Sequence, residues 1–84
     1  MPWMARTPKQ AATAAKEAAA LRVAFGQRLT ALREAAGLTK YALAKAANVD
    51  AGFLAAVEAG RKEPGWCVVV RLAKALGVTP DAFC

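Results

Sequence analysis

The sequence predicts an all-α fold, and three observations support that prediction. Apolar residues recur at spacings of three and four, as on one face of a helix, and no segment alternates like a half-buried strand. Threonine, asparagine and aspartate stand where helices would begin or turn. Glycines stand where helices would end. A compact bundle of four to five short helices, preceded by an alanine-rich N-terminal extension, therefore accounts for the whole chain.

The N-terminal extension differs in composition from the rest. The stretch TPKQ is typical of a capping box, with Thr7 as the N-cap, Pro8 at the first helical position and Gln10 reaching back to a backbone donor. The following AATAAKEAAALR has high helix propensity but an almost entirely alanine surface, so packing adds little per residue. We divide the chain into an Ala/Lys-rich extension at residues 1–20, either a helical arm or flexible, and a folded domain at residues 21–84.

An amphipathic helix is predicted from Leu21 onward. Glutamine, arginine and glutamate side chains fall on the faces away from its apolar stripe, as such a helix requires. Gly37 then supplies the helix stop, because glycine readily adopts the left-handed backbone that ends helices. The apolar stripe comprises Leu21, Phe25, Leu29, Leu32 and Ala36.

Two short helices follow, joined by a tight turn. Thr39 can cap a second helix at about residues 39–47, and Asp50 can cap a third at about residues 51–59, which ends at a glycine. Between them Asn48 suits the turn, because asparagine tolerates the left-handed backbone better than most residues. The positions expected to be buried in these two helices are Leu43, Ala44, Leu54 and Val57.

The C-terminal part contains one more helix and a last short turn. The polar connector RKEPG leads to a fourth helix from about Trp66 to Leu76. Thr79 followed by Pro80 is the cap-then-proline pattern of a further helical turn.

Charge and hydropathy narrow the class of partner. The net charge of +6, from twelve Lys and Arg against six Asp and Glu, favours an acidic partner such as nucleic acid or an anionic membrane surface. The longest strongly apolar run, WCVVV, is far shorter than the roughly 18 residues that a membrane helix needs. We therefore expect a soluble, cytoplasmic protein with no membrane-spanning helix, and we do not assign a membrane to it as a partner.

The residue types that are missing argue against catalysis. The chain contains no serine and no histidine, which removes the usual activated nucleophiles and the commonest general base. Its carboxylates show no paired pattern. Cys67 and Cys84 are two thiols without histidine, too few ligands for a zinc site. We predict that the protein is not an enzyme and that it has no catalytic residues, no metal and no cofactor.

Several segments agree in order and spacing with one known family. They are the LREAAGLT lead-in, a helix containing Leu43 and Ala44, the NVD turn, VEAGRKEP and the closing LAKALGVTPDAF. From about Arg22 to Phe83 the chain resembles the Cro/C1-type (XRE-like, phage-repressor-like) helix-turn-helix family. The resemblance implies a repressor-like bundle in which the second and third helices form the helix-turn-helix and the third enters the DNA major groove.

The resemblance also implies which residues contact DNA. Lys40 matches a position that contacts a phosphate or a base, and Tyr41 beside it can add a hydroxyl donor. Arg61 and Lys62 match loop positions that approach the DNA backbone. The reading face of the third helix maps onto Ala51, Gly52, Phe53, Ala55 and Ala56. A structural ion pair of the family maps onto Arg33 and Glu58.

The reading face departs from the family pattern, in which polar residues are common. Each well-formed bidentate contact to a base discriminates by about 1–3 kcal/mol, and these alanine, glycine and phenylalanine side chains form none. They suit thymine methyl groups and a close approach of the backbone to the groove. The sequence therefore predicts a small DNA-binding transcriptional regulator that binds double-stranded DNA as a homodimer, with modest base specificity and mainly phosphate contacts.

An alternative concerns the apolar start of the fourth helix. Cys67 and Val68 fall where relatives place polar residues, whereas Trp66 matches a core position. One explanation is that the N-terminal extension folds back over WCVVV and adds core. The other is a protein interface, since exposed apolar patches tend to mark such contacts. An antitoxin-like or adaptor module would bind its partner through the third helix or the Trp66–Val70 face, with weak or no DNA binding.

Overall fold

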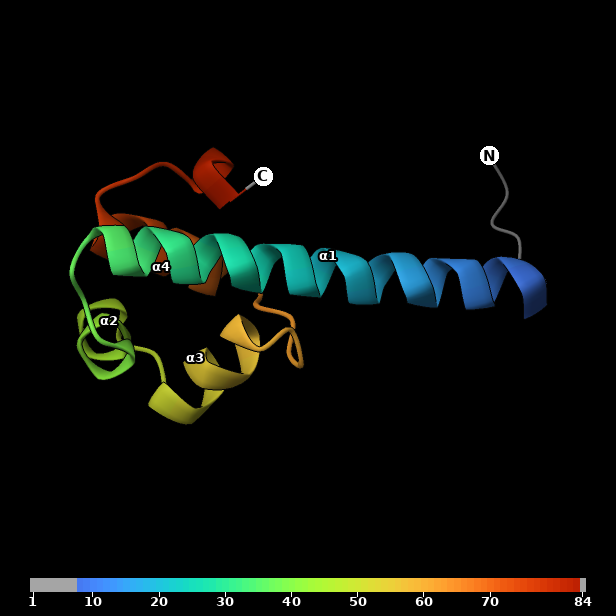
Figure 1. Ribbon diagram of the computed structural model, residues 1–84, viewed down its shortest axis with the longest axis horizontal. Helices are drawn as coiled ribbons and strands as arrows, with labels where there is room; N and C mark the ends of the chain where they lie inside the picture. The colour runs from blue at the N-terminus through green and yellow to red at the C-terminus, as the bar shows by residue number, and fades with distance from the viewer. Residues whose placement is uncertain (1–7, 84) are drawn as a thin grey trace.

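The computed structural model describes residues 8–83, all in helices and their connections. No strand occurs in this range, so the predicted all-α class is confirmed. Figure 1 shows the shorter helices gathered around one end of a long first helix. The elements are α1 (Pro8–Ala35), α2 (Lys40–Ala47), α3 (Ala51–Glu58), α4 (Trp66–Leu76) and a 3-10 turn, η1 (Pro80–Phe83).

Helix α1 is one continuous helix of 28 residues. Its N-terminal half, blue in Figure 1, projects beyond the body that the other elements form. Residues 8–20 of the extension therefore do not fold back over α4, and that explanation of the apolar WCVVV run is wrong for them. No proline or glycine interrupts residues 9–25, and alanine has the highest helix propensity. Pro8 is the first helical residue as predicted, whereas Thr7 lies outside the described residues. The division at residue 20 stays a prediction, since the helix runs through it.

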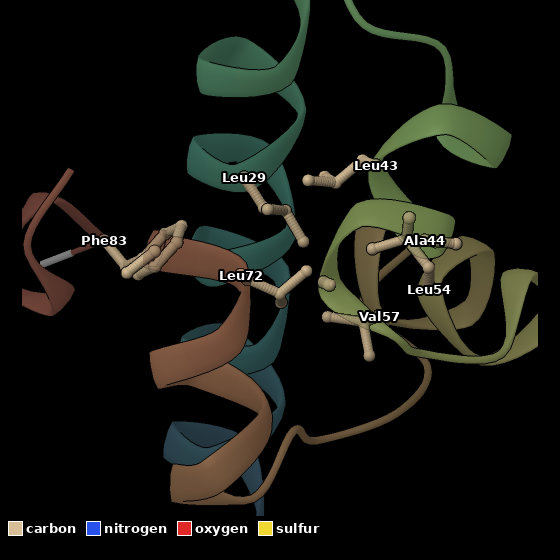
Figure 2. Packing of buried hydrophobic residues seen from close by; sticks show 9 residues of the cluster. Leu29, Leu43, Ala44, Leu54, Val57, Leu72 and Phe83 are labelled. Atoms are coloured by element: carbon tan, nitrogen blue, oxygen red, sulfur yellow. The ribbon is translucent and has the colours of Figure 1, made fainter. Parts of the chain in front are cut away.

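The hydrophobic core lies between the C-terminal half of α1 and the other elements (Figure 2). Five leucine and valine side chains are 0% exposed, and fully burying a leucine or valine contributes about 1.5–3 kcal/mol. The ring of Phe83 closes the core from η1, with its centroid 4.9 Å from that of Phe25. These five side chains, from all four helices, are Leu29, Leu43, Leu54, Val57 and Leu72.

Three expected core positions are instead exposed. Leu21 and Trp66 have 70% and 68% of their surface accessible. Both have the helical phase of the core-facing side of their helices, but the other described elements leave most of each side chain uncovered. Ala36 is exposed because α1 ends at Ala35, before the left-handed Gly37 (φ 72°). Helical periodicity identified the face correctly but not how far the body reaches along it.

Candidate nucleic-acid interface

The turn between α2 and α3 is fixed by backbone conformation and two side-chain caps. The Thr39 hydroxyl oxygen accepts a hydrogen bond from the Ala42 backbone N–H at 3.0 Å, and Asp50 Oδ2 accepts one from the Phe53 N–H at 2.9 Å. Asn48 adopts the left-handed conformation at φ 55°, ψ 51°. Both predicted caps and the predicted turn residue are therefore confirmed. Because the connection is this short and this well capped, α3 has a defined direction relative to α2.

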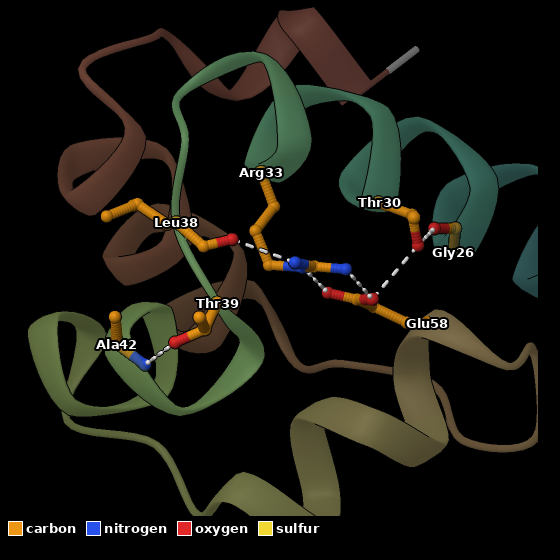
Figure 3. Close-up of polar contacts among 7 residues, drawn as sticks. All are labelled: Gly26, Thr30, Arg33, Leu38, Thr39, Ala42 and Glu58. Carbon is orange, nitrogen blue, oxygen red and sulfur yellow. Dashed lines mark hydrogen bonds and ion pairs between the residues drawn. The ribbon is translucent and has the colours of Figure 1, made fainter.

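A buried polar network attaches the C-terminal end of α3 to α1 (Figure 3). Arg33 Nε donates to Glu58 Oε2 at 2.8 Å and Nη2 donates to Oε1 at 3.2 Å, a bidentate pair with side chains 10% and 3% exposed. Arg33 Nη1 also donates to the carbonyl oxygen of Leu38 at 2.8 Å. The hydrogen bond to Glu58 raises the pKa of the Arg33 guanidinium although burial acts in the opposite direction, so the group stays charged.

Two residues of this attachment were not identified from the sequence. The Thr30 hydroxyl lies 3.0 Å from Glu58 Oε1 and 2.8 Å from the Gly26 carbonyl oxygen. Gly26 is buried, and a Cβ built on it would lie 2.5 Å from the Glu58 carbonyl oxygen and 2.6 Å from that of Val57. The available signal was their spacing: Gly26, Thr30 and Arg33 follow one another at four and three residues, on one face of α1.

The predicted reading residues are only partly accessible. Ala51 and Gly52, at the start of α3, are exposed, and Phe53 and Ala55 are half-buried. Ala56 is only 8% exposed, which contradicts its assignment to the reading face. Successive helical residues are about 100° apart, so Ala56 flanks the fully buried Val57 on the core side of this short helix.

The predicted backbone-contacting residues lie at the surface. Lys40 begins α2, and Arg61 and Lys62 follow α3, so cations stand beside both ends of the α2–α3 unit. Tyr41 is 69% exposed. Within residues 8–83 none of the three cations forms an ion pair. A hollow of about 380 Å³ lies between α2 and the start of α3, lined by residues that include Tyr41, Lys45 and Ala51. The hollow therefore brings the positive charge of Lys45 together with the small Ala51 at the start of α3.

No helix in the described part of the chain is long and apolar enough to cross a membrane.

Residues 24–83 match the family model described as a helix-turn-helix domain. No match was found among curated protein sequences.

Solved structures provide similar folds. The restriction-modification controller protein C.AhdI from Aeromonas hydrophila is 35% identical at a TM-score of 0.74, over 75% of this chain and 96% of that one. The clp gene regulator ClgR from Corynebacterium glutamicum is 35% identical at a TM-score of 0.72, over 75% of this chain and 67% of that one. A second structure of ClgR from C. glutamicum is 36% identical at a TM-score of 0.71, over 75% of this chain and 82% of that one. With the capped α2–α3 unit, these matches show that the chain belongs to the Cro/C1-type (XRE-like) helix-turn-helix family.

Proposed function

We propose that the protein is a small DNA-binding transcriptional regulator that acts as a cytoplasmic homodimer and has no enzymatic activity. The observation that carries the proposal is the α2–α3 unit: two caps fix it, its first residues on α3 are exposed, and Lys40, Arg61 and Lys62 beside it form no ion pair among the described residues. Three free cations of this kind suit DNA phosphates, which supply most of the sequence-independent affinity.

Base specificity in this proposal is modest. Ala51 and Gly52 carry no side-chain donor or acceptor, so α3 makes no bidentate contact to a base edge. Their small size lets the backbone approach the groove and lets the Ala51 methyl group contact thymine methyl groups. The remaining discrimination comes from sequence-dependent DNA shape, which is read through the positions of the phosphates.

The double substitution Arg61→Ala, Lys62→Ala tests the phosphate contacts. It is expected to weaken binding to a duplex from the protein's own upstream region and to a scrambled duplex alike. The logarithm of the DNA-binding constant decreases with the logarithm of the salt concentration, and each phosphate contact makes this slope steeper by about 0.9. The double variant should therefore have a slope that is shallower by about 1–2. Fluorescence anisotropy over a salt series measures both quantities.

The matched control is Arg71→Ala, Lys74→Ala, which removes the same charge from exposed positions on α4. It should leave the slope unchanged. Equal slopes for the two double variants would show that net charge, rather than these contacts, drives binding. Equal affinity of the unmodified protein for both duplexes at every salt concentration would contradict a sequence-specific regulator.

The exposed Trp66 favours a second candidate function, an antitoxin-like or adaptor module on the same fold. Its side chain is 68% accessible beside the exposed Cys67, at the start of α4. If DNA binding is the function, Trp66→Ala should change DNA affinity less than twofold and the melting temperature by no more than a few degrees, since exposed side chains contribute little to stability. Anisotropy and thermal unfolding check both. No binding to either duplex even at low salt would favour the second candidate.

A further inference from the structure

The projecting half of α1 carries an apolar stripe that is covered only at its inner end, where Phe25 packs against Phe83. We define the arm as residues 8–22 and the seam as the stripe along residues 11–25. Seam residues alternate at spacings of three and four, the 3.5-residue period of helices that pair with another helix. Leu21, in the seam, is 70% exposed, and Figure 1 shows that no other element lies along the arm. The seam residues are Ala11, Ala14, Ala18, Leu21 and Phe25.

A groove lies at the base of the arm, where it meets the body. Its volume is about 510 Å³, and the residues that line it come from α1, the connector before α4, α4 and η1. Most of them are apolar, including Leu21, Phe25, Pro64, Val69 and Phe83. The inner end of the seam thus continues directly into the groove.

We infer that the arms of two copies of this chain pair antiparallel, seam against seam, so that the stretch from Ala14 to Ala18 of each arm lies over the groove of the other copy. The inference rests on the homodimer of the proposed function and names the surface that forms it. Neither arm nor groove has another occupant among the described residues.

The distribution of side-chain size along the seam selects this partner and this direction. The outer seam residues are alanines, and the inner ones are Leu21 and Phe25. In an antiparallel pair with Ala18 opposite the second copy's Leu21, Ala14 lies opposite its Phe25, so every large side chain meets a small one. A parallel pair would place large on large at one end and alanine on alanine at the other. One interhelical distance could not pack both ends well.

The size of the contact predicts a weak dimer. In this register the two seams overlap over residues 14–25, and twelve residues at 1.5 Å per residue give a contact about 18 Å long. Two facing half-cylinders of helix of that length bury on the order of 700 Å² in total. Contacts in the two grooves add to this. Stable specific interfaces start at about 1,200 Å², so the dimer should dissociate at low concentration.

Antiparallel pairing also places the two α3 helices suitably for one DNA duplex. The residues of α1 that hold α3, Gly26, Thr30 and Arg33, lie about 110° around the helix from the seam. The two-fold axis that relates the two copies is perpendicular to α1 and to the line that joins the two paired helices. Both α3 helices therefore lie on the same side of the helix pair. Thr30 is about ten residues from the midpoint of the pair, which separates the two α3 attachments by about 30 Å along α1. Half-sites one DNA turn apart are about 34–36 Å from centre to centre.

Sedimentation equilibrium of the full chain under reducing conditions tests the inference. Ala18→Glu places a carboxylate in the seam opposite Leu21 of the second copy and should weaken dimerisation at least tenfold. Ala20→Glu is the matched control, the same substitution on the exposed opposite face of the arm, and should leave the dimer unchanged. Thermal unfolding verifies that both variants fold. A monomer at every concentration, or equal effects of the two substitutions, would overturn the inference.

Disulfide trapping tests the direction of pairing, after Cys67 and Cys84 are replaced by alanine. A mixture of Ala18→Cys and Leu21→Cys chains should form a mixed disulfide. Ala14→Cys alone should form none, because antiparallel arms separate the two copies of residue 14 by about 16 Å along the helix, beyond disulfide reach. A disulfide between two Ala14→Cys chains would show parallel arms and overturn the inference.

The two proposals fail separately. A dimer that Ala18→Glu dissociates, but that binds the upstream and scrambled duplexes equally, would contradict the regulator and leave the arm pairing intact. A protein that binds its upstream duplex specifically, but whose dimerisation constant is unchanged by Ala18→Glu, would support the regulator and contradict the arm pairing.

Discussion

Replacing Glu58 with alanine is expected to lower the free energy of unfolding by about 3–5 kcal/mol, because it leaves the guanidinium of Arg33 buried without its anion. The Arg33 and Glu58 side chains are only 10% and 3% exposed, so water compensates little. Thr30 loses one of its two acceptors as well. In a domain of this size a loss of about 1 kcal/mol in unfolding free energy lowers the melting temperature by about 4–8 °C. The melting temperature of Glu58→Ala should therefore fall by at least about 12 °C. Chemical denaturation followed by circular dichroism measures the change.

Two further variants make the Glu58 result interpretable. Glu34→Ala removes a carboxylate from the exposed residue next to Arg33 and should cost less than about 0.5 kcal/mol. Arg33→Met combined with Glu58→Leu removes both charges and should recover most of the loss, since apolar residues of similar volume often replace a buried pair without cost. Recovery will be incomplete, because the Leu38 carbonyl loses its donor. If Glu58→Ala and Glu34→Ala are equally stable, the pair does not hold α3 to α1.

Signals that act within a few residues were sufficient to predict the boundaries of α2 and α3 to within one residue. Thr39 and Asp50 cap through bonds to residues three positions on, and Asn48 needs only its own backbone conformation. Such interactions depend little on the rest of the fold, so the sequence specifies them directly. The turn that presents α3 could therefore be predicted in full.

Burial at the ends of elements could not be predicted in the same way. Leu21 and Trp66 have the correct helical phase, yet their exposure depends on where neighbouring elements stop. Ala56 is buried because α3 is short and its core face is broad, whereas the family pattern placed it among the reading residues. For the candidate site, the sequence identified the surface cations but not Gly26, because the close approach of a helix is visible only in three dimensions.

Gly26→Ala is expected to destabilise the protein although it improves the intrinsic helix propensity of α1. Alanine is favoured over glycine inside a helix by about 1 kcal/mol. The new Cβ, however, would lie 2.5 and 2.6 Å from the backbone carbonyl oxygens of Glu58 and Val57, so α1 and α3 must move apart. Overpacking of this kind costs about 1–3 kcal/mol, and because the obstructing atoms are backbone we expect the upper part of that range. The net loss in unfolding free energy should be about 1–2 kcal/mol.

Gly65→Ala is the control for Gly26→Ala, because Gly65 has an ordinary φ of −74° and a Cβ there would meet nothing within 4 Å. Because Gly65 is the N-cap of α4 and alanine is a poorer N-cap than glycine, Gly65→Ala should cost about 0.5–1 kcal/mol, without any displacement of α3. The informative readout is DNA affinity measured at low temperature, where both variants are folded. Displacing the end of α3 moves the exposed residues at its start relative to Arg61 and Lys62, so Gly26→Ala should bind DNA more weakly even when folded, and Gly65→Ala should not. Wild-type affinity of folded Gly26→Ala would mean that the α1–α3 contact stabilises the fold without setting the geometry of the DNA-binding surface.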